Sequence, residues 1–71
     1  MDRDRLRRMT DNARRLRDNG HLRRGITLAH AADLLWTYSS PELYELLVIR
    51  RGWSPKTYGL FVAEAMIKAL L

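Results

Sequence analysis

The sequence has no cysteine, no long apolar run and only two histidines. Without cysteine, disulfides and thiolate metal sites are excluded. No acidic residue is spaced to complete a metal site with His21 or His30, so we expect neither metal nor cofactor. No run reaches the roughly 18 apolar residues of a membrane-spanning helix. The charged N-terminus lacks the apolar core of a secretory signal, so a cytoplasmic location is expected.

Catalytic motifs are also missing. The chain has no glycine-rich phosphate loop, and its serines are explained as helix caps instead of members of a serine–histidine–acid arrangement. We therefore expect a protein that is not an enzyme. Its 71 residues suffice for one small domain, which needs well-packed helices or a partner chain to be stable. The apolar share of 46% and the charged share of 30% indicate a globular chain instead of a disordered one.

The positive charge is confined to the first third of the chain. Residues 1–24 hold nine Arg and four Asp, which gives +5, whereas residues 25–71 hold four basic and four acidic residues, which gives zero. The basic segment reads as an amphipathic helix from Asp2 to Asn19 that ends at Gly20. Its thin apolar stripe consists of Leu6, Met9, Ala13 and Leu16.

Arginines of this helix are candidate phosphate contacts, namely Arg7, Arg8, Arg14 and Arg15. However, Asp4 and Asp11 are spaced to form ion pairs along the helix, Asp4 with Arg8 and Asp11 with Arg14 or Arg15. The segment has no aromatic residue to stack on bases. The sequence therefore favours a solvated, self-paired helix face over a nucleic-acid site.

Three more helices are predicted, each with its own start signal. Thr27 is the expected N-cap of a helix over 28–38 that is apolar nearly all round and so buried on several faces. The pairs Ser40-Pro41 and Ser54-Pro55 are typical of helix starts. They predict a helix from Pro41 to about Arg51, stopped by Gly52, and a last helix to the end of the chain. The fold class is thus all-α, a small bundle of about four helices.

The last helix is apolar on most of its surface. One stripe comprises Tyr58, Val62, Ala65, Met66 and Ala69, and much of the remainder is covered by Leu60, Phe61, Ile67, Leu70 and Leu71. A chain of this length cannot cover such a helix from every direction. We therefore expect the surplus to contact another chain.

The stretch Ala31-Ala32-Asp33-Leu34-Leu35-Trp36, the restart Ser40-Pro41-Glu42-Leu43-Tyr44 and the turn Arg51-Gly52-Trp53-Ser54-Pro55 occur in this order. Together they resemble the C-terminal end of bacterial transcription regulators of the tetracycline-repressor (TetR) family, over roughly residues 20–71. In that family the last two long helices pair with those of a second subunit in a four-helix dimer interface. Here they correspond to residues 27–51 and 54–71.

The resemblance implies a helical dimerisation and regulatory module over residues 25–71, preceded by the basic helix and loop of residues 1–24. The helix-turn-helix of the family is missing, so no sequence-specific DNA binding is expected of this chain alone. A small apolar effector is implied only if the chain belongs to a longer regulator. The predicted homodimer seam consists of Leu35, Leu43, Leu47, Tyr58, Phe61, Val62, Ala65, Met66 and Ala69.

Three aromatic residues admit two interpretations each. Trp36 and Tyr44 are candidates for an effector pocket, although core or interface packing is the interpretation the sequence favours. Trp53 is either an anchor for a partner or an apolar contact that closes the turn after Gly52, and the sequence favours the second.

Two alternative functions remain open. As alternatives to the homodimerisation module, the chain could act as a small basic nucleic-acid-binding protein that uses its first helix. It could also act as a partner module that forms a heterodimer with a full-length regulator. A steep salt dependence of DNA binding would identify the first, and co-purification of a heteromer would identify the second.

Overall fold

The computed structural model describes residues 2–71, and over this range the chain forms helices and loops without any strand. The elements are α1 (Asp2–Asp18), α2 (Leu28–Tyr38), α3 (Pro41–Tyr44), a π-helical segment η1 (Glu45–Arg50) and α4 (Pro55–Leu70). The predicted all-α fold class is confirmed.

The helix starts form as the sequence predicts. The Thr27 hydroxyl accepts a hydrogen bond from the His30 amide at 3.1 Å. Ser40 and Ser54 do the same for the amides of Leu43 and Thr57, at 3.3 Å and 3.1 Å. Each cap satisfies one of the amides that a helix leaves unpaired at its N-terminus.

The end of α1 is also the predicted one. Gly20 has a φ of 75°, a conformation that costs glycine little. Its amide donates to the Arg17 carbonyl and the His21 amide donates to the Leu16 carbonyl, at 3.0 Å and 2.9 Å. This is the Schellman arrangement, which reverses the chain toward α2.

The third predicted helix, Pro41 to about Arg51, differs from the prediction. Only Pro41–Tyr44 is α-helical, and Glu45–Arg50 winds as a π-helix. Residues 2–71 therefore contain three α-helices of more than ten residues, α1, α2 and α4, where the sequence predicts about four helices. Hydrogen bonds that span five residues give less rotation per residue than α-helical bonds, so the positions that share a face change along η1. Leu46 and Ile49 of this segment remain 53% and 66% exposed.

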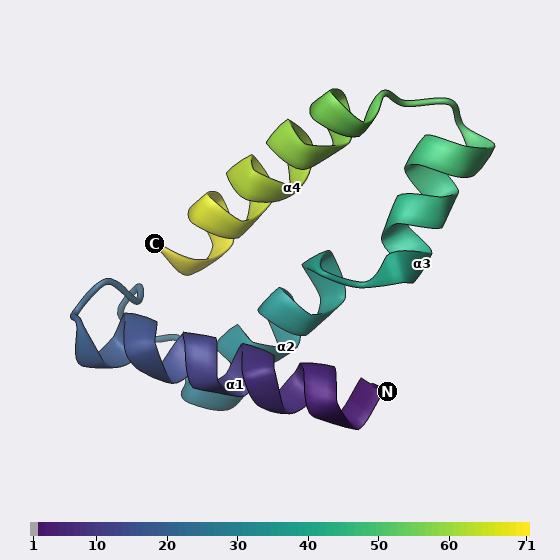
Figure 1. Ribbon diagram of the computed structural model, residues 1–71. Helices are drawn as coiled ribbons and strands as arrows, with labels where there is room; N and C mark the ends of the chain where they lie inside the picture. The colour runs from purple at the N-terminus through teal and green to yellow at the C-terminus, as the bar shows by residue number, and fades with distance from the viewer. Residues whose placement is uncertain (1) are drawn as a thin grey trace.

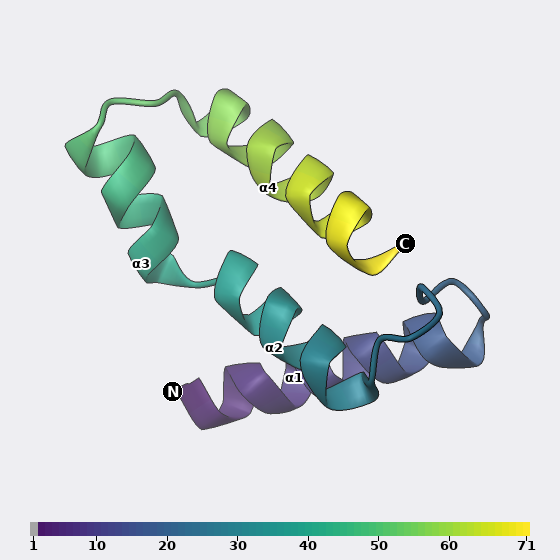
Figure 2. The ribbon, with the colours of Figure 1, turned by 180° about the vertical axis from the view of Figure 1, so that it is seen from behind.

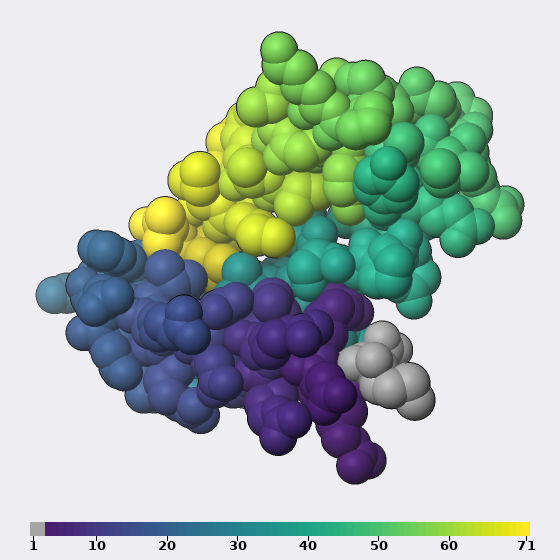
Figure 3. Space-filling view, in the orientation of Figure 1, coloured from purple at the N-terminus to yellow at the C-terminus, as the bar shows by residue number. Residues whose placement is uncertain are grey.

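The helices make an open arrangement, with α1 crossing α2 and α4 returning toward α2 along one edge of the molecule (Figures 1 and 2). The Cα radius of gyration is 12.9 Å, whereas a compact domain of this length has a value of about 11 Å. The shortest dimension of the chain is 15 Å. Much of the α4 surface is consequently exposed (Figure 3).

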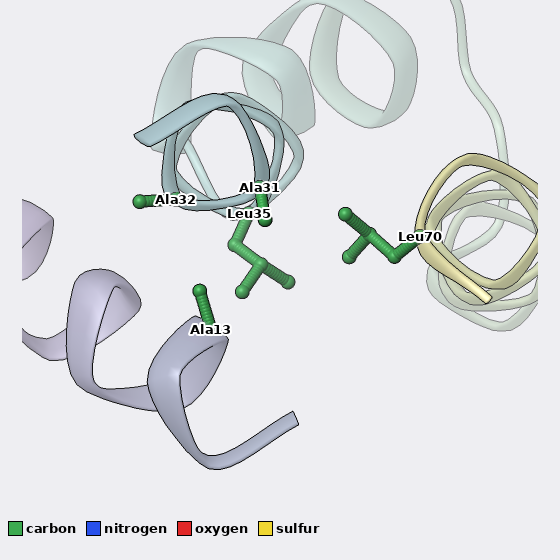
Figure 4. Packing of buried hydrophobic residues seen from close by; sticks show 5 residues of the cluster. All are labelled: Ala13, Ala31, Ala32, Leu35 and Leu70. Atoms are coloured by element: carbon green, nitrogen blue, oxygen red, sulfur yellow. The ribbon is translucent and has the colours of Figure 1, made fainter. Parts of the chain in front are cut away.

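The core lies where α1, α2 and α4 meet, and it is small. Its buried members are Ala13, Ala31, Ala32, Leu35 and Leu70 (Figure 4). Because three of the five are alanines, α1 and α2 pack closely but bury little apolar area. Among the side chains that the structure describes, no large one is fully buried. The core therefore contributes little stability for a chain of this length.

Arg23, in the loop between α1 and α2, holds the end of α4. Its amide donates to the Leu70 carbonyl at 2.6 Å, and its guanidinium donates to the Lys68 carbonyl at 2.7 Å. Both acceptors belong to the last turn of α4, whose carbonyls lack partners within the helix. The positive charge is also favourable at this negative end of the helix dipole.

Replacing Arg23 by alanine is expected to lower the free energy of unfolding by about 1 kcal/mol, because the guanidinium contact is lost while the backbone contact remains. Urea unfolding followed by far-UV circular dichroism measures the change. Arg24→Ala is the matched control, since Arg24 is the exposed neighbour. Equal effects of the two substitutions would show that the Arg23 contact contributes nothing.

Candidate association surface

Two faces of α4 carry apolar side chains, and one of them is half-buried against the rest of the chain while the other is more exposed. The inner face holds the half-buried residues Tyr58, Val62, Ala65, Met66 and Ala69. On the opposite face Leu60, Ile67 and Leu71 are 64%, 55% and 55% exposed. We call these three residues the outer stripe. Their spacing of seven and four residues places them on one line along the helix.

The predicted dimer seam coincides mainly with the inner face of α4. Leu35 belongs to the core, and Met66 and Ala69 pack against it. Leu43 and Leu47 are half-buried in α3 and η1. Because the seam residues already pack within the chain, the outer stripe is the more exposed apolar face of α4. The seam itself stays a prediction.

Edge-to-face aromatic contacts join α4 to α3 and to the loop between η1 and α4. Tyr44 and Tyr58 have ring centroids 5.2 Å apart at an angle of 83°, and Trp53 and Phe61 have centroids 5.5 Å apart at 84°. Such pairs stabilise by roughly 0.5–1.5 kcal/mol beyond their buried area. The Trp53 contact agrees with the interpretation that this side chain closes the turn after Gly52, whose φ is 76°.

Trp36 lies in a different place from Tyr44, against the N-terminal part of α1. The Arg5 guanidinium lies 5.2 Å from the centre of its ring, and Arg5 also donates to the Trp36 carbonyl and, at 2.8 Å, to the Ser39 hydroxyl. The arginine thus combines a cation–π contact with capping of the C-terminal end of α2. The indole Nε1 is buried, and none of the residues that the structure describes forms a hydrogen bond with it.

Two shallow grooves border α4. One, of about 170 Å³, is lined by Leu16, Leu35, Met66, Ile67, Leu70 and Leu71. The other, of about 270 Å³, is lined by Phe61, Glu64, Ala65 and Lys68. Both lie below the roughly 300–1,000 Å³ of typical small-molecule sites. Neither groove is lined by Trp36 or Tyr44, so these two candidates for an effector pocket are not brought together there.

The basic face of α1 is partly neutralised by its own acidic residues. Arg14 pairs with Asp11 at 3.0 Å, as the spacing predicts, whereas Asp4 pairs with Arg7 at 3.2 Å instead of Arg8. These side chains are at least half exposed, so each pair contributes at most about 1 kcal/mol. This geometry favours the solvated, self-paired face.

Arg8 and Arg15 are exposed as well, and neither has an acidic partner within residues 3–71. Nothing in their surroundings distinguishes them as a phosphate site. As candidate phosphate contacts they stay a prediction.

Two contacts of this surface have no signal in the sequence, and a third feature, the outer stripe, has an ambiguous one. Arg5 and Arg23 act on helices 31 and 45 residues away, and no local pattern indicates such contacts. The outer stripe did have a signal, because Leu60, Ile67 and Leu71 follow helical spacing. However, a second apolar stripe on the same helix has similar spacing, and periodicity alone does not tell which of the two faces inward.

No protein-family model, curated protein or solved structure matches the chain. The resemblance to the TetR family therefore stays a prediction from the sequence motifs. Over residues 2–71 the structure brings no three histidine, aspartate or glutamate side chains together as metal ligands. None of the helices in this range has the length and apolarity to span a membrane.

Proposed function

We propose that the chain is a helical self-association module that forms a homodimer through the outer stripe of α4. In this proposal it serves as the dimerisation end of a TetR-like transcription regulator and has no DNA-binding motif of its own. The observation that carries the self-association is the surplus of exposed surface on an open helical chain.

The surplus can be given a magnitude. The chain exposes 5377 Å² at a mass of 8.3 kDa, whereas a compact monomer of that mass exposes about 4,600 Å². The excess is about 800 Å². A standard protein–protein interface covers about 800 Å² on each partner. One isologous contact would therefore bring the exposed surface of each chain close to that of an ordinary compact protein.

The small core supports the same proposal. Five buried residues, three of them alanine, provide little apolar burial against the conformational entropy of 71 residues. A second chain that covers the outer stripe adds apolar burial at about 25 cal/mol per Å² and so stabilises the fold. By mass action the stability then depends on the concentration of chains.

The resemblance gives this association its biological setting. The capped restart at Ser40-Pro41 and the turn at Gly52-Trp53 are part of the pattern that resembles the TetR C-terminus, and both position α4. In the family, the corresponding helices of two subunits form a four-helix interface. We assign this pairing role to α4.

Sedimentation equilibrium of the 71-residue chain tests the proposal. We expect a mass of twice 8.3 kDa at micromolar concentration and above, and a melting temperature that rises with chain concentration, because only the folded dimer buries the outer stripe. A chain that keeps its helical circular dichroism but sediments as a monomer at every concentration would contradict the proposal.

A further inference from the structure

We infer that α4 packs antiparallel against α4 of a second copy, in a register centred on Met66 that sets Glu64 beside Lys68 of that copy. The inference rests on the proposed self-association and adds its geometry. It is carried by three features of the exposed face of α4, namely the positions of its leucines, its central isoleucine and its two charges.

In this register, apolar residues of the two copies lie at similar levels along the helix axis. With a rise of about 1.5 Å per residue, the levels of Leu60 and of Leu71 in the second copy differ by only about 1.5 Å along the helix axis. Ile67 lies about 3 Å along the axis from its own symmetry mate. The outer stripe thus forms one continuous contact with an Ile67 pair at its centre and a Leu60–Leu71 pair at each end. A two-fold axis makes both end pairs identical.

The charges favour the antiparallel arrangement, in which each of them gains an opposite charge of the second copy. Glu64 and Lys68 already form an ion pair within the chain, at 2.9 Å, with side chains 66% and 76% exposed. In a parallel two-fold pair of helices, Glu64 and its symmetry mate would lie on opposite sides of the contact, as would the two Lys68 side chains, so Glu64 would gain no contact with Lys68 of the second copy. In the antiparallel register, Glu64 lies level with Lys68 of the second copy and the reverse holds by symmetry. The two chains then share a network of four alternating charges.

The groove beside this pair is suited to the end of the second helix. Phe61, Glu64, Ala65 and Lys68 line it on the same side of α4. In the antiparallel register the level of Phe61 coincides with that of Leu71 in the second copy. The apolar part of the groove, formed by Phe61 and Ala65, is thus available to the Leu71 side chain. The helix dipoles are also opposed in this arrangement, which is favourable at both ends.

Cysteine crosslinking tests the register, since the chain itself has no cysteine. Ile67→Cys is expected to form a disulfide-linked dimer under mild oxidation, because the two positions face each other at the centre. Leu60→Cys alone is expected not to link, because the two copies of this position are about 18 Å apart along the axis. A mixture of Leu60→Cys and Leu71→Cys chains is expected to link one with the other.

Charge exchange gives a second measurement that needs no oxidation. Glu64→Lys is expected to raise the dimer dissociation constant about tenfold, because two attractive pairs become repulsive. The double variant Glu64→Lys with Lys68→Glu is expected to restore it. Circular dichroism of each variant confirms that the helices are retained.

The two proposals fail in different ways. If the parent chain dimerises but Leu60→Cys links to itself and the mixed chains do not link, the antiparallel register is overturned while the self-association stands. If Glu64→Lys leaves the dissociation constant of the dimer unchanged, the proposed contact between Glu64 and Lys68 of the second copy is overturned. A parent chain that is monomeric at all concentrations would instead overturn the proposed function, and this inference with it.

Discussion

Ile67→Glu is expected to convert the dimer into a monomer and to raise its dissociation constant at least about a hundredfold. Ile67 is 55% exposed in the single chain, so a glutamate at this position is tolerated by the isolated fold. In the dimer the two substituted side chains would be buried next to each other across the two-fold axis. Desolvation of the carboxylates and their mutual repulsion cost several kcal/mol together, and about 2.7 kcal/mol already corresponds to the hundredfold change.

Sedimentation equilibrium at several chain concentrations measures this effect. The matched control is Ala29→Glu, which adds the same charge at an exposed position of α2. It is expected to leave the dissociation constant within about twofold of the parent value, because single surface substitutions usually change little. If both variants dimerise as the parent does, the outer stripe is not the contact surface.

Leu70→Ala is expected to have the largest effect on folding. Leu70 is 2% exposed and is the only buried side chain that α4 contributes to the described core. Removing a buried leucine costs about 2–5 kcal/mol through lost burial and the cavity that remains. A loss of this size is a large share of the total stability of a small domain. We therefore expect most of the helical signal to disappear at room temperature.

Urea unfolding at a fixed chain concentration, followed by circular dichroism, provides the comparison. Leu46→Ala removes the same side chain from a position that is 53% exposed on η1, and it is expected to cost less than about 1 kcal/mol. A Leu70→Ala variant as stable as Leu46→Ala would mean that α4 is not held by the core contact.

The local structure could be predicted from the sequence because its signals are local. Thr27, Ser40 and Ser54 cap the helices at which they were expected, and Gly20 and Gly52 end helical segments with positive φ. Each depends on the geometry of a few neighbouring residues. The helices α1, α2 and α4 begin and end within a residue or two of their predicted bounds, whereas α3 ends at Tyr44 and continues as η1.

The π-helical segment and the orientation of α4 could not be predicted in the same way. The run Leu46-Leu47-Val48-Ile49 suits an α-helix and a π-helix equally in its pattern, and it gives no sign that Glu45–Arg50 is more widely wound. In α4 both faces are apolar, so the apolar pattern does not determine which face packs against the rest of the chain. The orientation of α4 depends instead on Leu70 entering the core beside Leu35. That choice is made by tertiary packing, which a local pattern does not contain.

The order of contacts along the chain has a kinetic consequence. The helices α1 and α2 are joined by residues 19–27 only, so their packing requires the closure of a short loop. The contact between Arg23 and Lys68 spans 45 residues, and closing a longer stretch of chain costs more entropy. We therefore expect the α1–α2 hairpin to form before α4 docks. Until α4 docks, Leu70 and the outer stripe are exposed together, and this is the stage at which the chain is most prone to aggregate.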